Sequence, residues 1–520
     1  MIMKLHWLDV LTLISYLLVI VSVGIYFSRK NTSTEGYFVG NRSYSGWVIG
    51  LSMIGTSISS ITFLAYPADS FKTSWLRFLP NMVLPIVIIT SAYLFLPFFK
   101  RNNIISAYEY LENRFGPSVR IYGAVTFLIG QLVRISLILY LLSLMVHEVT
   151  SLSILQSILL SGIVVGLYTI IGGIEAVIWT DVIQTITLVF GGIICIGVII
   201  NQLPQGFSQI IDIALTNNKL SFSELKNGIL HPVPWGISLS NKTGIMMILL
   251  GFSWFFQEYI TNQNIIQRYA ATKNESEARK AMFISTINIP IWIFFMFLGT
   301  SLYAFFQVFP SEATTDMLTG ARNAEDVLPY FIINYLPAGI SGLIIAAAIA
   351  AAMSSLDSSI NSIATVSVHD IYRRHLAPNK NDLHYLHVAW YIATFTTAIM
   401  IIGACMLEYS KMNTLQDTYN TIGSIVMGGV LGLYLLGFCT KRGKEKSVWV
   451  GITLTMIFSL WTVLAKYDFL PAWLQAPFDL YYTGILGQIV MFAGIFVGAI
   501  LFSDSNKNLQ NLTIWTKSNK

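Results

Sequence analysis

The sequence predicts an all-helical protein that crosses a membrane many times. Of its 520 residues, 54% are hydrophobic and 11% are charged, whereas a soluble protein carries about a quarter charged residues. The chain also repeats uncharged apolar stretches of roughly 20 residues, which is the length of a helix that spans a bilayer. The polar stretches between them are short. We therefore expect a single membrane domain over residues 1–520 and no soluble domain.

About thirteen apolar segments are expected to be membrane-spanning helices. The first has no basic leader and no small-residue cleavage site, so it is expected to be a retained helix rather than a signal peptide. The segments are 8–28, 44–66, 79–99, 121–148, 154–173, 179–201, 243–263, 281–307, 335–366, 385–406, 417–440, 446–466 and 480–502.

Lysine and arginine are distributed unevenly between the loops. The loops after the odd-numbered segments and the C-terminal tail hold 21 of the 31 basic residues, the N-terminus and the other loops hold nine, and Arg134 lies inside a segment. Short cytoplasmic loops are enriched in basic residues. The N-terminus is therefore expected outside, and the tail at 503–520 in the cytoplasm.

Two segments are interrupted by polar residues and glycine. They are GLSMIGTSISSITFLA in segment 44–66 and GFSWFFQEYITNQNII in and after segment 243–263. They lie five segments apart and so begin on opposite sides of the membrane. Paired interruptions of this kind indicate an inverted repeat with a binding site near the midplane.

Ionisable residues inside a bilayer are costly, so each one indicates a function or an internal partner. Arg134, near the middle of segment 121–148, could bind a substrate carboxylate through its guanidinium fork. Alternatively it forms an ion pair with Glu258 or Asp357. Asp181, at the start of segment 179–201, is either a helix-terminal carboxylate stabilised by the helix dipole or a cation ligand or proton carrier. Glu258 is a proton carrier or a partner for a basic residue.

The stretch AAMSSLDSSINS, residues 351–362, places serines and Asp357 inside an apolar segment. Small-residue packing explains one or two serines, but not a carboxylate. Hydroxyl and carboxylate oxygens without histidine or cysteine suit a small hard cation, and one aspartate favours a monovalent ion over calcium. In segment 44–66, GTSISSITF adds further hydroxyls. Its glycine favours local unwinding, which would free carbonyl oxygens for an ion. A merely polar helix is the alternative for that segment alone.

The chain resembles the sodium/solute symporter family. GTSISSITF, GGIEAVIWTDVIQ, TNQNIIQRY (261–269) and AAMSSLDSSINS carry the resemblance, which covers nearly the whole chain. Within the family it looks closest to bacterial sialic acid transporters, on SAYEYLENRF (106–115) and the position of Arg134. The resemblance implies a leucine-transporter-type core of two inverted five-helix repeats, at 44–201 and 243–440. The helix at 8–28 would lie before this core and two further helices, at 446–502, after it.

The resemblance also implies binding residues. The sodium site shared across the fold would use Gly55, Ile58, Ala351, Ser354 and Ser355. A second sodium site, found in some members, would use Asp181, Ser354, Asp357 and Ser358. The substrate pocket would be formed by Ser57, Ser59, Thr62, Asn81 and Arg134.

Three residues depart from the sialic acid transporters. Asp357 replaces a serine, so the second site would bind sodium more strongly or take a proton instead. Asn81 replaces a glutamine. Arg77 stands at the outer entrance where an aromatic is expected, and it either favours an anionic substrate or extends to the outer surface.

The implied function is sodium-coupled import of a small polar solute by alternating access across the bacterial inner membrane. An anionic sugar such as sialic acid is the expected substrate. A neutral sugar, another organic acid or proton coupling is the alternative. One sodium ion, or two, would be the only cofactor. We expect a monomer in the bilayer, with no nucleic-acid partner. We find no repeated pore loop of a channel. An intramembrane enzyme would need a paired histidine and carboxylate constellation, but most of the seven histidines lie in loops or near segment ends. The three cysteines indicate neither a disulfide framework nor redox or metal chemistry.

Overall fold

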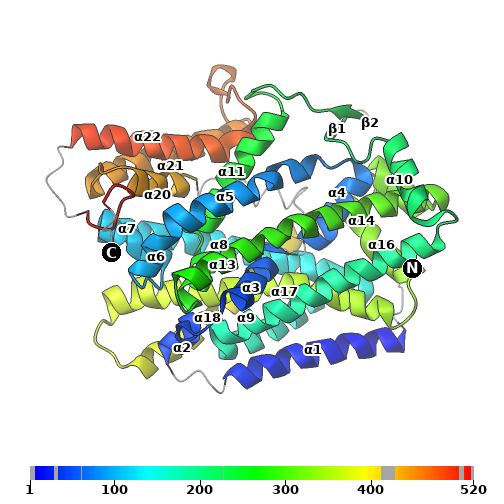
Figure 1. The fold of residues 1–520 in the computed structure, drawn as a ribbon, viewed down its shortest axis with the longest axis horizontal. Coiled ribbons are helices and arrows are strands. Elements are labelled where there is room, and N and C mark those ends of the chain that lie inside the picture. The colour runs from blue at the N-terminus through cyan, green and yellow to red at the C-terminus, as the bar shows by residue number, and fades with distance from the viewer. Residues whose placement is uncertain are drawn as a thin grey trace.

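The computed structural model describes residues 6–28, 33–59, 61–150, 152–226, 228–410, 428–502 and 509–516. Most of them lie in helices (Figure 1). The helices are α1 (Trp7–Ser28), α2 (Thr34–Val39), α3 (Gly46–Ser57), α4 (Tyr66–Lys72), α5 (Leu84–Thr90), α6 (Leu96–Arg101), α7 (Ala107–Arg114), α8 (Pro117–Val149), α9 (Ile154–Gln202), α10 (Gly206–Thr216), α11 (Gly244–Thr261), α12 (Gln263–Ala271), α13 (Glu275–Ile284), α14 (Asn288–Val308), α15 (Glu312–Thr319), α16 (Val327–Tyr335), α17 (Ile340–Val366), α18 (Asp382–Ser410), α20 (Val430–Cys439), α21 (Glu445–Lys466) and α22 (Thr483–Leu501).

Short helical turns join several of these helices. They are η1 (Gly40–Arg42), η2 (Ile61–Ala65), η3 (Leu76–Val83), η4 (Ser91–Phe95), η5 (Ser285–Ile287), η6 (Ala324–Asp326), η7 (Ser367–Leu376), η8 (Ala472–Leu474) and η9 (Leu480–Tyr482). Strands β1 (Ser223–Lys226) and β2 (Ile229–Pro232) form an antiparallel hairpin with Ser223 opposite Pro232.

The expected membrane spans are largely confirmed, but their number is not. Among the described residues, ten helices are long and apolar enough to cross a membrane, or eleven if the bent pair of α3 and the helix after it is one span. Two more predicted spans coincide with shorter apolar helices, Ile154–Ile170 and Val430–Cys439. Residues 417–427 of the predicted span 417–440 lie outside the described part of the chain. The count of thirteen therefore stays a prediction.

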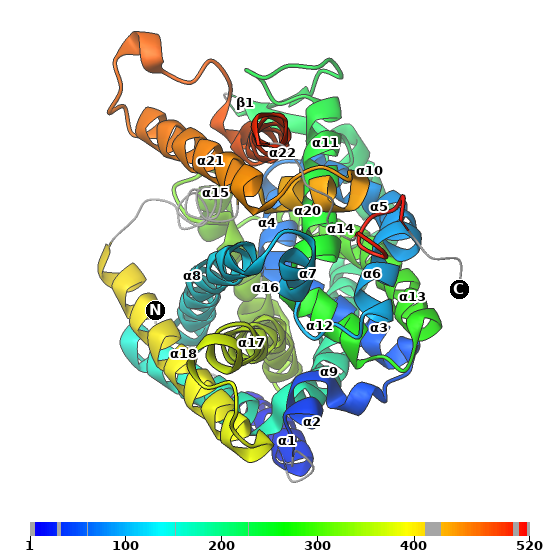
Figure 2. The ribbon, with the colours of Figure 1, turned by 90° about the vertical axis from the view of Figure 1, so that its left-hand side faces the viewer.

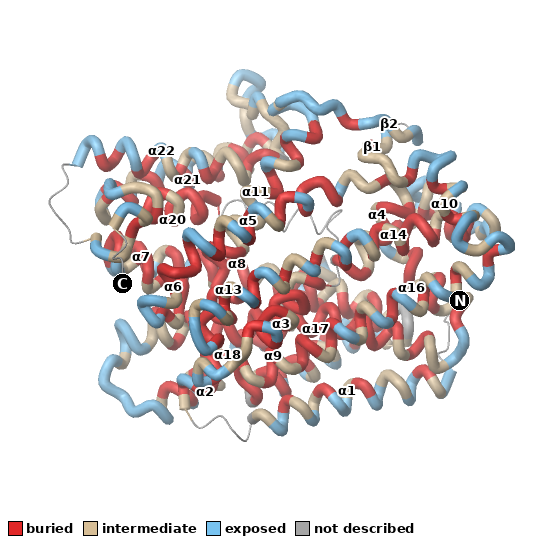
Figure 3. The backbone as a smooth tube through the Cα atoms, in the orientation of Figure 1, coloured by how far each residue is buried: buried red, intermediate tan, exposed pale blue. Residues whose placement is uncertain are grey.

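Helix α17 lies at the centre of the bundle. It packs against α1, α3, α8, α9, α12 and α18, and Figure 2 shows it end-on with several of these helices around it. In its most apolar window 89% of the residues are buried, against 17% for α1. Figure 3 shows the same contrast between the buried centre and the exposed outer helix. The serine-rich stretch therefore faces other helices.

The broken span formed by α3 and α4 runs beside the span formed by α13 and α14. Helix α3 packs against α13, and α4 packs against α14. The second pair is so close that a Cβ atom on Gly299 of α14 would collide with the carbonyl oxygen of Pro67 in α4. The glycine is required there because the two backbones touch.

A buried lysine ties the α10–β1 loop to the end of α4. Lys219 Nζ donates to the carbonyl oxygens of Phe71 (2.7 Å) and Thr73 (3.1 Å) and lies 3.9 Å from the centre of the Tyr303 ring. Burial lowers the pKa of Lys219 to about 7. These bonds satisfy carbonyls that the end of a helix leaves without partners.

At the other end of the bundle, ion pairs join α7 to η7. His369 Nε2 lies 2.9 Å from Glu109 Oε1, and Arg120 lies 2.6 Å from both Glu112 and Asp370. Glu109 also accepts bonds from two backbone N–H groups, at Ile105 and Ser106. The network fixes η7, the continuation of α17, to the start of α8.

Candidate functional site

The predicted unwinding of segment 44–66 is confirmed. Helix α3 ends at Ser57, Ile58 is extended (φ −90°, ψ 114°), and the following helix is bent away by 65°. The last turn of a helix leaves carbonyl oxygens without intrahelical partners. Gly55 and Ile58, two of the three predicted carbonyl ligands, both lie at this helix end.

Asp181 is the centre of a buried polar cluster made by four helices. Its Oδ1 accepts a bond from Ser354 Oγ (2.6 Å), and its Oδ2 accepts bonds from Ser52 Oγ (2.6 Å) and Arg268 Nη2 (2.6 Å). The side chains of Asp181 and Arg268 are fully buried. The cluster joins α3, α9, α12 and α17 at the level of the serine-rich stretch.

The prediction that Asp181 lies at the start of a helix was wrong. The apolar helix begins at Gly172, and the one non-helical residue inside α9 is Gly173 (φ 58°, ψ −162°). Asp181 therefore lies more than two turns inside the span, where the helix dipole does not act on it. An ion pair, and not a helix end, stabilises its charge.

Arg268 is a site residue that the sequence reasoning missed. Its Nε donates to Ser52 (2.8 Å), and its Nη2 donates to Ser358 (2.7 Å) as well as to Asp181. The guanidinium thus lies between two of the four predicted ligands of the second sodium site. The residue stands in TNQNIIQRY, a stretch that was read as loop, and its place within that motif was the available signal.

Asp357 is fully buried and has no ion-pair partner within the described part of the chain. Its Oδ2 accepts a bond from Tyr168 Oη at 2.9 Å and a longer one from Thr180 Oγ1 at 3.3 Å. Ser358 Oγ lies 3.4 Å from its Oδ1. The carboxylate therefore faces neutral donors on α9, and no basic residue forms a salt bridge with it.

Two buried serine and threonine hydroxyls near the cluster have no hydrogen-bond partner among the described residues. They belong to Ser355 and Thr185. Serine and threonine in helices commonly bond the carbonyl four residues earlier, as Thr180 and Thr187 of α9 do. An unpaired buried hydroxyl is costly, so these two oxygens are available to a bound ion.

Gly55 brings α3 against α9 beside these hydroxyls. A Cβ atom at this position would lie 2.7 Å from Thr185 Oγ1 and 2.9 Å from the carbonyl oxygen of Asp181. Both distances are shorter than a carbon–oxygen contact allows. The glycine is therefore needed for the close approach of the two helices. Thr185 was not singled out in the sequence.

The predicted substrate residues are spread over α3, η2, η3 and α8, with Ser59 in the break between α3 and η2. Asn81 Nδ2 donates to Tyr66 Oη (2.9 Å), a residue that the sequence did not indicate. Ser57 Oγ bonds the carbonyl of Met53 (2.9 Å), and Ser59 and Thr62 are buried at the break. Arg134 is half-buried on α8. No hydrogen bond or ion pair joins Arg134 to the other four.

The ion pairs suggested for Arg134 are absent from the described residues. Glu258 accepts a bond from Asn262 Nδ2 (2.7 Å), and Asp357 is bonded to Tyr168. Arg77 forms a salt bridge with Asp69 on the partly exposed surface. Among the described residues, Arg134 therefore has no ion-pair or hydrogen-bond partner within its span, which is the arrangement expected of a residue that binds an anionic ligand.

The chain belongs to the sodium:solute symporter family, whose sequence profile matches residues 37–454. It is accordingly a sodium-coupled secondary active transporter of a multi-pass membrane protein family, and not an enzyme. Among its relatives, a sodium/sialic acid symporter of Aliivibrio fischeri is 30% identical over 96% of this chain and 94% of the relative. A sodium/sialic acid symporter of Proteus mirabilis is 30% identical over 97% and 98%. The sodium/glucose cotransporter of Vibrio parahaemolyticus is 27% identical over 94% and 90%.

Solved structures share the fold. A Na+-coupled sialic acid symporter, in a substrate-bound outward-open state, superposes with a TM-score of 0.84 at 28% identity, over 96% of this chain and 98% of that one. The nucleobase–cation symporter Mhp1 superposes with a TM-score of 0.55 at 12% identity, over 92% and 98%. The expected leucine-transporter-type helical architecture is confirmed.

Proposed function

We propose that this chain imports a small anionic sugar, with sialic acid as the leading candidate, by symport with sodium. The unpaired guanidinium of Arg134 carries the proposal. An arginine inside a span needs an anion, and a sugar carboxylate supplies a planar acceptor for its fork. The two relatives that are sodium/sialic acid symporters support this choice. Ser57, Ser59, Thr62 and Asn81 would bind the polar groups of the ring.

The shared sodium ion would lie between the broken span and α17. Carbonyl oxygens of Gly55, Ile58 and Ala351 and the hydroxyls of Ser354 and Ser355 would hold it. The unpaired hydroxyl of Ser355 fits this role. Thr185, which lies next to Gly55, is a further candidate ligand. Bound sodium would hold α3 against α17 and complete the substrate pocket. Loss of the ion to the cytoplasm would loosen that contact.

A second sodium ion at Asp181, Ser354, Asp357 and Ser358 has weaker support. Arg268 already places a positive charge between Asp181 and Ser358. Asp357 is the carboxylate of this set that forms no ion pair with any described residue. Asp357→Ser should lower the Hill coefficient of sodium activation if it holds an ion. An unchanged coefficient would leave one sodium ion per cycle.

The orientation and the assembly are also proposals. The bias in lysine and arginine places the N-terminus outside and the tail in the cytoplasm. Two inverted repeats over 44–201 and 243–440 would surround the ion site in a monomer.

Uptake of labelled sialic acid into proteoliposomes tests the function. An inward sodium gradient should drive accumulation, and Arg134→Ala should abolish it. Lys380→Gln, at an exposed position in the α17–α18 connection, is the matched control for loss of a positive charge. Uptake at the same rate with and without a sodium gradient would reject the coupling of transport to sodium. Uptake of a neutral sugar, with none of sialic acid, would favour the alternative substrate class.

A further inference from the structure

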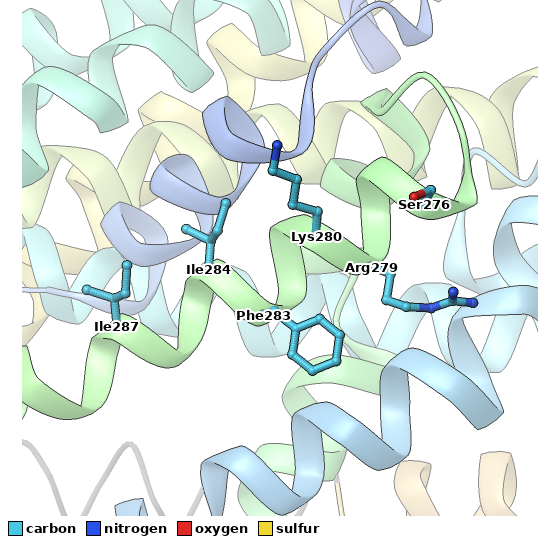
Figure 4. Close-up of a pocket in the computed structure, with 6 residues that line it drawn as sticks. All are labelled: Ser276, Arg279, Lys280, Phe283, Ile284 and Ile287. Atoms are coloured by element: carbon cyan, nitrogen blue, oxygen red, sulfur yellow. The ribbon is translucent and has the colours of Figure 1, made fainter.

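A shallow groove of about 520 Å³ lies over α13 and η5, away from the ion site. It is lined by Ser276, Arg279, Lys280, Phe283, Ile284 and Ile287. These residues recur every three or four positions, so they share one helix face. Figure 4 shows Lys280 and Ile284 on the side of α3, with Phe283 and Arg279 on the side of the neighbouring helix.

All six lining residues belong to α13 and η5, and two other spans flank this helix face. On one side, a Cβ atom on Gly50 of α3 would lie 2.6 Å from Ile284 Cβ, so the two helices are in close contact. On the other side, Tyr93 of η4 lies 6.2 Å from the Phe283 ring, and the Arg279 guanidinium lies 4.7 Å from the centre of the Tyr93 ring. The groove thus lies between two spans, and its floor is the outer face of α13.

Charge and apolar surface are separated along the groove. Arg279 and Lys280 lie in the first turns of the apolar segment Glu275–Val308, and Ile287 lies seven residues further on, about 10 Å deeper at 1.5 Å per residue. Phe283 and Ile287 are 37% and 46% exposed. One end therefore offers cations at the membrane surface, and the other offers apolar side chains at the depth of acyl chains.

The basic end retains unpaired positive charge. Glu275 is shared by Arg101 (3.5 Å) and Arg279 (2.8 Å), so one carboxylate faces two guanidinium groups. Glu277 is held by the backbone N–H of Gly46 in α3. Lys280 is exposed and has no ion-pair partner among the described residues. An anionic group is therefore complementary to this end.

We propose that this groove binds an anionic phospholipid, with the headgroup phosphate at Arg279 and Lys280 and an acyl chain along Phe283, Ile284 and Ile287. The positive-inside bias places this end in the cytoplasmic leaflet, where anionic lipids attract basic side chains. The site is independent of the sodium and substrate residues.

Native mass spectrometry of the full-length protein in detergent tests the proposal. The protein is titrated with dioleoylphosphatidylglycerol or with dioleoylphosphatidylcholine, which have the same acyl chains. The first phosphatidylglycerol should bind at least about tenfold more tightly. Lys280→Gln should weaken it about fivefold, the effect of one basic side chain near an anionic surface, and leave phosphatidylcholine binding unchanged. Lys280 forms no ion pair with any residue that the structure describes, so this variant should fold normally.

Two further variants and one soluble probe complete the experiment. Phe283→Ser with Ile287→Ser should weaken both lipids, because the acyl contacts are removed. Lys380→Gln, outside the groove, should change neither. Equal affinity for the two lipids, or an unchanged Lys280→Gln variant, would overturn the proposal. Displacement of the lipid by glycerol 3-phosphate at equal affinity would also overturn it, because the groove would then be a site for free anions.

Discussion

Asp181 accepts hydrogen bonds from side chains on three other helices, and Arg268 provides the only charge that faces it within ion-pair distance among the described residues. Removing one member of a buried ion pair leaves the other charge uncompensated, at a cost of about 3–5 kcal/mol. Arg268→Gln should therefore lower the free energy of unfolding by that amount. Thermal unfolding in detergent measures it. Asp181→Asn combined with Arg268→Gln should recover part of the loss. Additive losses in the double variant would show that the two side chains do not interact.

Ser355 and Thr185 each have one buried hydroxyl without a hydrogen-bond partner among the described residues. If both oxygens serve the ion, Ser355→Ala and Thr185→Val should reduce the stabilisation that sodium gives in a thermal-shift assay. Thr187→Val is the matched control, because Thr187 bonds its own helix at Ile183. Stability without sodium should change little in either variant. A full sodium-dependent shift in Thr185→Val would remove Thr185 from the site.

At the scale of the element, α3 depends on Gly55 for its approach to α9. Gly55→Ala should force the helices apart, since a Cβ atom there meets a hydroxyl and a backbone carbonyl. We expect a loss of sodium-driven uptake together with a loss of thermal stability. Gly197→Ala in α9 is the control, because a Cβ atom at Gly197 meets nothing within 4 Å. Equal behaviour of the two variants would show that the contact at Gly55 is dispensable.

The connection of α7 to η7 depends on pH. Burial alone would raise the pKa of Glu109, but its bonds with His369 and with two backbone N–H groups lower the pKa to about 2, from an ordinary 4.5. A lowered pKa means that the carboxylate stabilises the fold above about pH 4.5 and that this contribution is lost as the pH falls towards 2. The protection factors of the α7 amides, which correct for the intrinsic exchange rate at each pH, should therefore fall over that window. In Glu109→Gln the protection factors should already be low at neutral pH and should change little between about pH 4.5 and 2.

Much of the helical arrangement could be predicted from the sequence, because a helix in a bilayer needs about 20 apolar residues. The break in the helix after Gly55 could also be predicted, because the polar stretch GTSISSITF interrupts an apolar segment. Arg268 was not, because it was counted among the loop residues of the charge bias, whereas the fold buries it against Asp181. Likewise, no local pattern shows that Thr185 lacks a bond to its own helix. Such facts depend on contacts between segments far apart in the sequence.

For the whole molecule, the charge bias gives a testable topology. Ser238→Cys, before α11, should react with a membrane-impermeant maleimide in intact cells, and Lys380→Cys should react after permeabilisation. Lys380 is exposed and Ser238 is partly exposed in the structure. A background with Cys195, Cys405 and Cys439 replaced by serine avoids labelling of the native thiols. Labelling of Lys380→Cys in intact cells would reverse the orientation.

The pairing of half-helices has a mechanical consequence. Helix α4 and helix α14 touch backbone to backbone at Gly299, while α3 is packed between α9 and α13. The chain bends by 65° between α3 and the helix that leads into α4. The residues proposed to bind sodium include Gly55 and Ile58 at this bend. If α4 rotates about this bend, α14 should move with it as one rigid body. A sodium ion bound to the carbonyl oxygens at this bend would therefore restrain both the span of α3 and α4 and the adjacent span of α13 and α14.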